Sequence, residues 1–220
     1  MFRKLVSASL TLATAVGLQF ANAPVGSAAA SGGCNLQGTA TLTPGLNSSA
    51  QPFSYTFTGA LSSCHSSDSS APGTGTIGAG QLYQAVTSSG PDPANPTVTI
   101  THTEHFYEPA ANGNGGCTNS TTSGVAVVTW GDNTITVVSY NTTGALAAVA
   151  LQGSVVASVG LGAPDHLYTW EPTSLTVTTN RYDGASAKAA LAFQPPDPTA
   201  CNTPTGATTA GISGATTLNQ

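Results

Sequence analysis

The segment Phe53-Ser54-Tyr55-Thr56-Phe57-Thr58 alternates aromatic with polar residues, and this pattern decides the fold. Successive side chains of a β-strand point to opposite faces, so the aromatic residues predict a buried face and the Ser and Thr residues a solvent-facing one. We therefore expect a strand over residues 53–61. Its expected partner covers residues 39–43, and the turn-rich residues 44–52 join the two strands into an antiparallel hairpin.

The rest of the chain continues this β pattern, since Thr, Val and aromatic residues dominate and no segment keeps a helical period. A second hairpin is predicted where residues 124–130 and 134–140 flank Gly131-Asp132-Asn133, which tolerate positive φ. Further strands are expected over residues 97–107, 145–151, 154–161, 167–170, 175–182 and 187–193, loops over residues 66–75, 88–96 and 110–123, and a weak strand or loose tail after residue 202. The pattern predicts an all-β fold: an antiparallel β-sandwich, with a β-barrel as the alternative.

The first 30 residues have the features of a secretory signal peptide. Arg3 and Lys4 form a basic start, residues 5–20 are uncharged and mostly apolar, and small residues fill positions 21–30. Cleavage is expected after Ala28, Ala29 or Ala30. The sequence therefore predicts a secreted, extracellular protein whose residues 31–220 form a single β domain.

Charge excludes two classes of partner. Residues 31–220 contain only two basic residues, Arg181 and Lys188, against nine acidic ones, a net charge of −7 (2 − 9) with His neutral. Such a chain cannot neutralise a run of phosphates, so neither nucleic acid nor an anionic membrane surface is an expected partner. The apolar stretch over residues 145–161 is shorter than the ~20 residues of a spanning helix, so no membrane insertion is expected.

Four cysteines in the exported part predict two disulfides. Cys34 and Cys64 are centred on residue 49, within the turn of the first hairpin, so they are expected to lie opposite each other. Cys117 and Cys201 then pair by exclusion. No C-x-x-C pair supports a zinc site made of cysteines.

The N-terminal part also resembles a known group of proteins. Gly38-Thr39-Ala40-Thr41-Leu42-Thr43-Pro44-Gly45-Leu46, followed by Tyr55-Thr56-Phe57-Thr58-Gly59 and Cys64, is similar to the start of small secreted Ser/Thr/Gly-rich β proteins of actinobacteria. That group has no assigned activity. The resemblance therefore implies secretion and the first disulfide, and it carries over no functional residue.

The best candidate for chemistry is His102-Thr103-Glu104-His105. On a strand, His102 and Glu104 lie two residues apart on one face, so an imidazole and a carboxylate there could share a proton in catalysis or bind one metal ion. His105 is expected to project to the opposite face. The alternative interpretation is a strand end whose polar groups are hydrogen-bonded and structural.

Two weaker candidates remain. Asp165-His166 could form a nucleophilic triad with a serine, although no G-x-S-x-G elbow exists. Trp130, Trp170, Tyr168 and Tyr182 could stack on sugar rings, since an aromatic side chain offers an apolar face with a polar edge.

These observations lead to two functional hypotheses. The first is a secreted, non-enzymatic β module with a binding or cell-envelope role, with a glycan or wall component as its partner, and without a cofactor. The alternative is a secreted hydrolase or metal-dependent enzyme that uses His102 and Glu104.

Overall fold

The computed structural model describes residues 31–145 and 147–219, so the expected signal peptide lies outside the described residues. The described chain is almost entirely β-structure. Its elements are β1 (Gly32–Leu46), β2 (Gln51–Ser66), β3 (Gly75–Ala79), β4 (Leu82–Asp92), β5 (Asn95–Tyr107), β6 (Ala111–Gly115), β7 (Asn119–Trp130), β8 (Ile135–Ala145), β9 (Ala148–Val156), β10 (Ser158–Gly162), β11 (Ser174–Thr178), β12 (Ser186–Gln194), the 3₁₀ turn η1 (Ala200–Asn202) and β13 (Ala207–Asn219).

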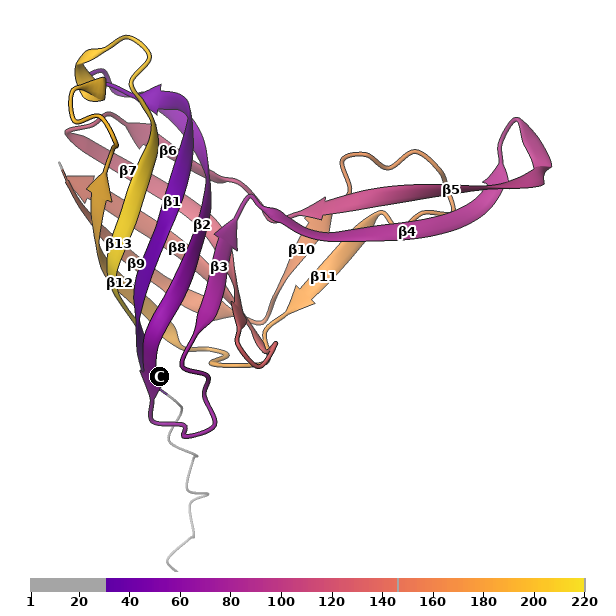
Figure 1. Ribbon diagram of the computed structural model, residues 1–220, viewed down its shortest axis with the longest axis horizontal. Helices are drawn as coiled ribbons and strands as arrows, with labels where there is room; N and C mark the ends of the chain where they lie inside the picture. Colours follow the sequence, from indigo (N-terminus) through magenta and orange to yellow (C-terminus); the bar gives the residue numbers. More distant parts are fainter. Residues whose placement is uncertain (1–30, 146, 220) are drawn as a thin grey trace, which may run out of the picture.

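The main sheet closes on itself as an antiparallel barrel of eight strand positions (Figure 1). Its order is β1, β13, β12, β9, β8, β7, then β3 and β6 together, then β2, which pairs with β1 again. β3 pairs with one end of β2 and β6 with the other, so these two short strands share one position in the wall. The residues between them leave the barrel at this point.

The predicted all-β fold is confirmed, but the predicted sandwich is wrong and the alternative, a barrel, is the architecture. The reason is the long-range pairing of β1 with β13, where Cys34 lies opposite Thr216. An open sheet would leave the edge of β1 unpaired, whereas this pairing removes the free edge. Both architectures bury one face of each strand, so the alternation of residues does not distinguish them.

Both predicted hairpins are present. Thr39 lies opposite Thr58 in the first, and Thr129 lies opposite Ile135 in the second, where Asn133 adopts a positive φ of 64°. Other boundaries differ. The expected loop over residues 88–96 contains the end of β4 and the start of β5, and the expected loop over residues 110–123 contains β6 and the start of β7. The expected strand over residues 167–170 is a loop. β9 runs through Gly153 without the expected break, and the C-terminal residues form the barrel strand β13.

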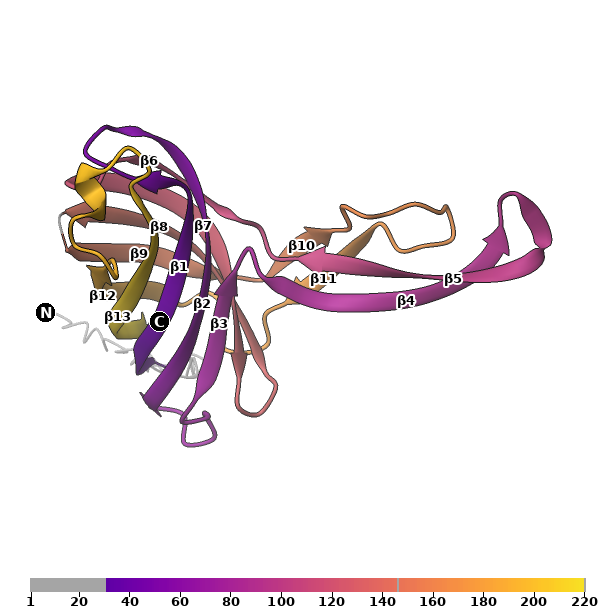
Figure 2. The ribbon, with the colours of Figure 1, turned by 45° about the horizontal axis from the view of Figure 1, so that its top comes forward.

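The residues that leave the barrel form a projecting arm. β4 and β5 make a long two-stranded ribbon, and β10 and β11 lie beside its barrel-proximal part (Figures 1 and 2). The loop over residues 163–173 connects β10 to β11 and reaches the ribbon. Two excursions that are distant in sequence therefore meet outside the barrel.

A second apolar core joins the arm to the barrel wall. Phe106 of β5 packs with Leu161 of β10 and Val177 of β11 against Val127 and Val137, which point outward from the barrel. The neighbouring residues of β7 and β8 point inward to the main core. This part of the wall is buried on both faces, which explains why β7 has a continuous apolar run instead of an alternating one.

Both predicted disulfides are confirmed: Cys34 is bonded to Cys64, and Cys117 to Cys201. The first joins β1 to β2, and the second joins the chain after β6 to η1. Such bonds persist in oxidising compartments, which is consistent with an extracytoplasmic protein. In the described residues no helix is both long and apolar enough to cross a membrane.

Candidate metal centre

Four side chains converge where the arm meets the β10–β11 loop. His102 and Glu104 come from one face of β5, as their spacing predicts, and His166 and Glu171 come from the loop opposite. The strand supplies two groups at a fixed separation, and the loop supplies the other two. We call these four residues the arm cluster.

The donor atoms of the arm cluster are close together. His166 Nδ1 lies 3.0 Å from Glu104 Oε1 and 3.8 Å from Glu171 Oε2, and His102 Nδ1 contacts Glu171 Oε1. One donor atom each from Glu104, His166 and Glu171 fits within 4.8 Å of the others. Imidazole nitrogen and carboxylate oxygen are donors that zinc and other divalent transition metals accept.

Both carboxylates of the arm cluster are buried, with a side-chain exposure of 0% each, whereas His102 and His166 are 25% and 30% exposed. Glu104 Oε1 contacts His166, but Glu104 Oε2 is buried without a hydrogen-bond partner among the described residues. Burying a carboxylate oxygen without a partner costs free energy. A proton donor or a cation is therefore the expected partner of Glu104 Oε2.

Glu171 is held in its ionised form by its neighbours. Burial raises the pKa of Glu171, but the backbone N–H groups of Tyr168 and Leu167, with His102, oppose this effect and bring the pKa below its ordinary value. The two N–H groups donate to Glu171 Oε2 at 2.8 and 2.9 Å. The loop therefore presents a fixed negative charge to β5.

Among the described residues, no arginine or lysine contacts the arm cluster. Arg181 is bound to Asp68 at 3.1 Å and to Asp132 at 2.8 Å, and Lys188 belongs to β12 in the barrel wall. These two are the basic side chains of the described residues. The charge of the two glutamates must be balanced by protonation, by the histidines or by a bound cation.

Two stacked aromatic side chains adjoin the arm cluster at His102. Tyr168 stacks on Trp170 with the ring centres 5.1 Å apart, and the His102 ring meets Tyr168 edge-on at 5.7 Å. The Trp170 indole lies against Gly90 of β4, where a Cβ atom would overlap the ring. Glycine at this position therefore lets the indole lie flat on the ribbon.

His105 and Asp165, which are next in sequence to residues of the arm cluster, contact each other separately from it. His105 Nδ1 lies 2.7 Å from Asp165 Oδ2, and the His105 backbone N–H donates to Asp165 Oδ1 at 3.1 Å. Both hydrogen bonds lower the pKa of Asp165, and the bond from the His105 side chain has the larger effect. Asp165 and His166 thus bind different residues of β5. In residues 31–145 and 147–219 neither imidazole shares a hydrogen bond with a serine or threonine hydroxyl.

The aromatic residues proposed for sugar stacking do not form one surface. Trp130 is buried in the barrel, where its Nε1 donates to Thr136 Oγ1 at 2.9 Å, and Tyr182 packs against it. Tyr168 and Trp170 stack on each other, and Tyr168 contacts His102 of the arm cluster. Their ring faces are partly used by each other and by Gly90.

The sequence pattern indicates His102 and Glu104 but does not connect them with Glu171, and it indicates His166 only as a member of a triad. One signal was available. Charged residues make up only 6% of the chain, yet several of them and three of its four histidines fall within residues 102–108 and 165–171. The chemistry of the cluster rests on its own geometry, because no protein-family model, curated protein or solved structure matches this chain.

Proposed function

We propose that the protein is a secreted, non-enzymatic β module that binds one divalent transition-metal ion in the arm cluster, with Glu104, His166 and Glu171 as ligands. The observation that carries this proposal is the pair of fully buried carboxylates that converge on an imidazole, with no lysine or arginine of the described residues beside them. Two carboxylate ligands together match the charge of a divalent cation.

The spacing of the donors suits zinc. A tetrahedral ion with ligands at about 2.0–2.1 Å has about 3.3 Å between neighbouring ligand atoms. The two distances from His166 Nδ1, 3.0 Å to Glu104 and 3.8 Å to Glu171, lie on either side of that value. His102 contacts Glu171 and orients it, as an outer-shell group does in many metal sites.

Burial favours binding over catalysis. Glu104 is 0% exposed, so a substrate could reach its carboxylate only if the surrounding side chains moved. A hydrolase using His102 and Glu104 remains the alternative hypothesis. A glycan or cell-envelope partner remains a prediction from sequence.

The test is a calorimetric titration of metal-stripped protein with Zn²⁺. We expect one ion per chain, and we expect Glu104→Gln and His166→Ala each to weaken binding by at least 10-fold. His105→Ala is the matched control, because His105 lies on the same strand but contacts Asp165 instead of the cluster. Equal binding by the wild type and Glu104→Gln would refute the proposal. Ester hydrolysis that depends on Zn²⁺ and Glu104 would support the alternative.

A further inference from the structure

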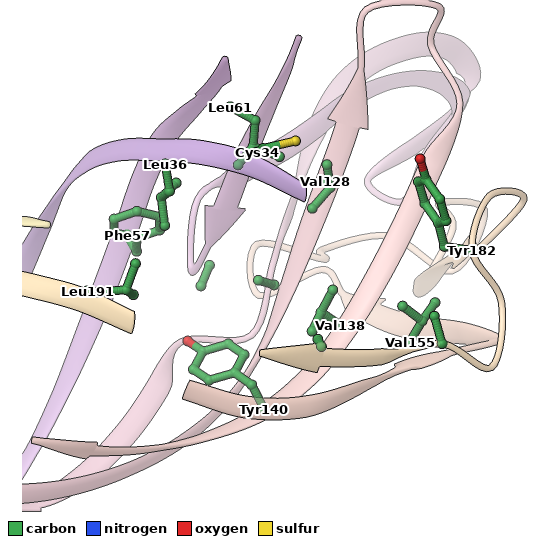
Figure 3. Packing of buried hydrophobic residues seen from close by; sticks show 14 of the residues in the cluster. Cys34, Leu36, Phe57, Leu61, Val128, Val138, Tyr140, Val155, Tyr182 and Leu191 are labelled. Atoms are coloured by element: carbon green, nitrogen blue, oxygen red, sulfur yellow. The ribbon is translucent and has the colours of Figure 1, made fainter. Parts of the chain in front are cut away.

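The barrel interior contains a partly open cavity, and none of the arm-cluster residues lines it. Its volume is about 170 Å³, and its walls are mostly apolar side chains from strands around the ring. Figure 3 shows Leu36, Phe57 and Leu191 on one side of the barrel interior and Val128 and Val138 on the other. An engineered apolar cavity of about 150 Å³ binds benzene, so this space is large enough for a similar molecule.

The cavity follows from small residues at inward positions. Ala40 of β1, Ala126 of β7 and Ala187 of β12 are buried in the main core, and Ala189 packs against it. An eight-stranded barrel is just wide enough to be filled by side chains or to hold one small ligand. Alanine at these positions leaves the centre unfilled.

One wall of the cavity carries a chain of four hydroxyl groups. Tyr55 Oη lies 2.8 Å from Tyr140 Oη and 3.3 Å from Thr122 Oγ1, which lies 2.7 Å from Thr142 Oγ1. Four hydroxyls joined by three hydrogen bonds use three protons, so one O–H group has no acceptor among these four hydroxyls. Burial raises the pKa of Tyr55 and of Tyr140, so both phenols keep their protons.

We infer that the barrel interior binds one small, uncharged, mostly apolar molecule about the size of a substituted benzene ring, which accepts a hydrogen bond from the hydroxyl chain. The apolar walls select for an apolar body, and the spare O–H group selects for one acceptor oxygen. The ligand is uncharged because the basic lining residues, His65 and Lys188, are both exposed and leave no cation among the buried walls.

Phenol and toluene are the probes, because they have nearly the same size and only phenol carries an acceptor oxygen. Binding is measured by calorimetry and by amide NMR shifts, with EDTA present so that the arm cluster is free of metal. We expect both probes to bind the wild type with one molecule per chain. We expect the double variant Tyr55→Phe/Tyr140→Phe to weaken phenol binding about fivefold and to leave toluene binding within about twofold.

A filling variant tests the location. Ala189→Phe places a ring inside the cavity and should abolish binding of both probes; its far-UV circular dichroism and melting temperature verify that it folds. If it does not fold, Ala126→Leu replaces it. The inference is overturned if neither probe binds the wild type, if binding survives in a folded filling variant, or if the double variant weakens both probes equally.

Discussion

Glu108 gives the protein a pH-dependent stability that can be worked out from its surroundings. The residue follows β5, is 7% exposed, and accepts a hydrogen bond on Oε2 from the Gln81 N–H at 3.3 Å. Its carboxyl lies against Gly78 of β3, where a Cβ atom would overlap it. Burial raises the pKa of Glu108 from its ordinary value of 4.5 to about 7, although the Gln81 hydrogen bond lowers it.

The direction in which stability changes with pH follows from proton binding. Between pH 4.5 and 7 the folded protein holds a proton on Glu108 that the unfolded chain has lost, so the free energy of unfolding decreases as pH rises. The shift corresponds to at most about 3 kcal/mol, and we expect about 2 kcal/mol because the carboxyl keeps some contact with solvent. The decrease in the free energy of unfolding is complete above pH 7 and absent below pH 4.5.

Glu108→Gln removes the titrating group and keeps its shape. We expect the variant to match the wild type near pH 4.5 and to be more stable above pH 7 by about 2 kcal/mol, as measured by urea unfolding across this range. Asp197→Asn is the control of opposite sign, because hydrogen bonds from Thr199 lower the pKa of Asp197, and this variant should be less stable at neutral pH. Parallel pH profiles for the wild type and Glu108→Gln would refute the reasoning.

Two further predictions concern stability. Replacing Cys117 and Cys201 by serine opens a loop with a sequence separation of 84, and we expect a loss of about 4–5 kcal/mol in the chain-entropy model, measured by calorimetric melting. A loss below about 1 kcal/mol would contradict that account. Gly90→Ala should displace the Trp170 indole from the ribbon, reduce stability by about 1–3 kcal/mol and shift the tryptophan fluorescence to longer wavelength. An unchanged emission spectrum would show that the Trp170 indole does not pack on Gly90.

Local sequence patterns predicted most of the strands but not the closure of the sheet into a barrel. The alternation around Phe53 and the turn at Asn133 identified both hairpins, because each depends on residues close in sequence. Closure depends on the pairing of Cys34 with Thr216, which no local pattern indicates. The expected loop over residues 88–96 failed for a related reason: its Ser, Gly and Pro residues suggest turns, yet much of it lies in β4, paired with β5.

The arm cluster was half predictable on the same grounds. His102 and Glu104 are two residues apart, so strand geometry alone places them on one face. His166 and Glu171 come from a loop that meets β5 because Phe106, Leu161 and their neighbours form the second core. That packing joins segments distant in sequence, so local patterns do not predict it. The sequence indicates the cluster only by the scarcity of charged residues elsewhere in the chain.

The central claim is that Glu104, His166 and Glu171 bind one metal ion together. Its most direct test is anomalous X-ray scattering at the zinc absorption edge, from crystals grown with one equivalent of Zn²⁺. We predict one strong peak between β5 and the β10–β11 loop, about 2.0–2.2 Å from an oxygen of each glutamate and from a nitrogen of His166. A peak only at the exposed His65, or no ordered peak, would contradict the account.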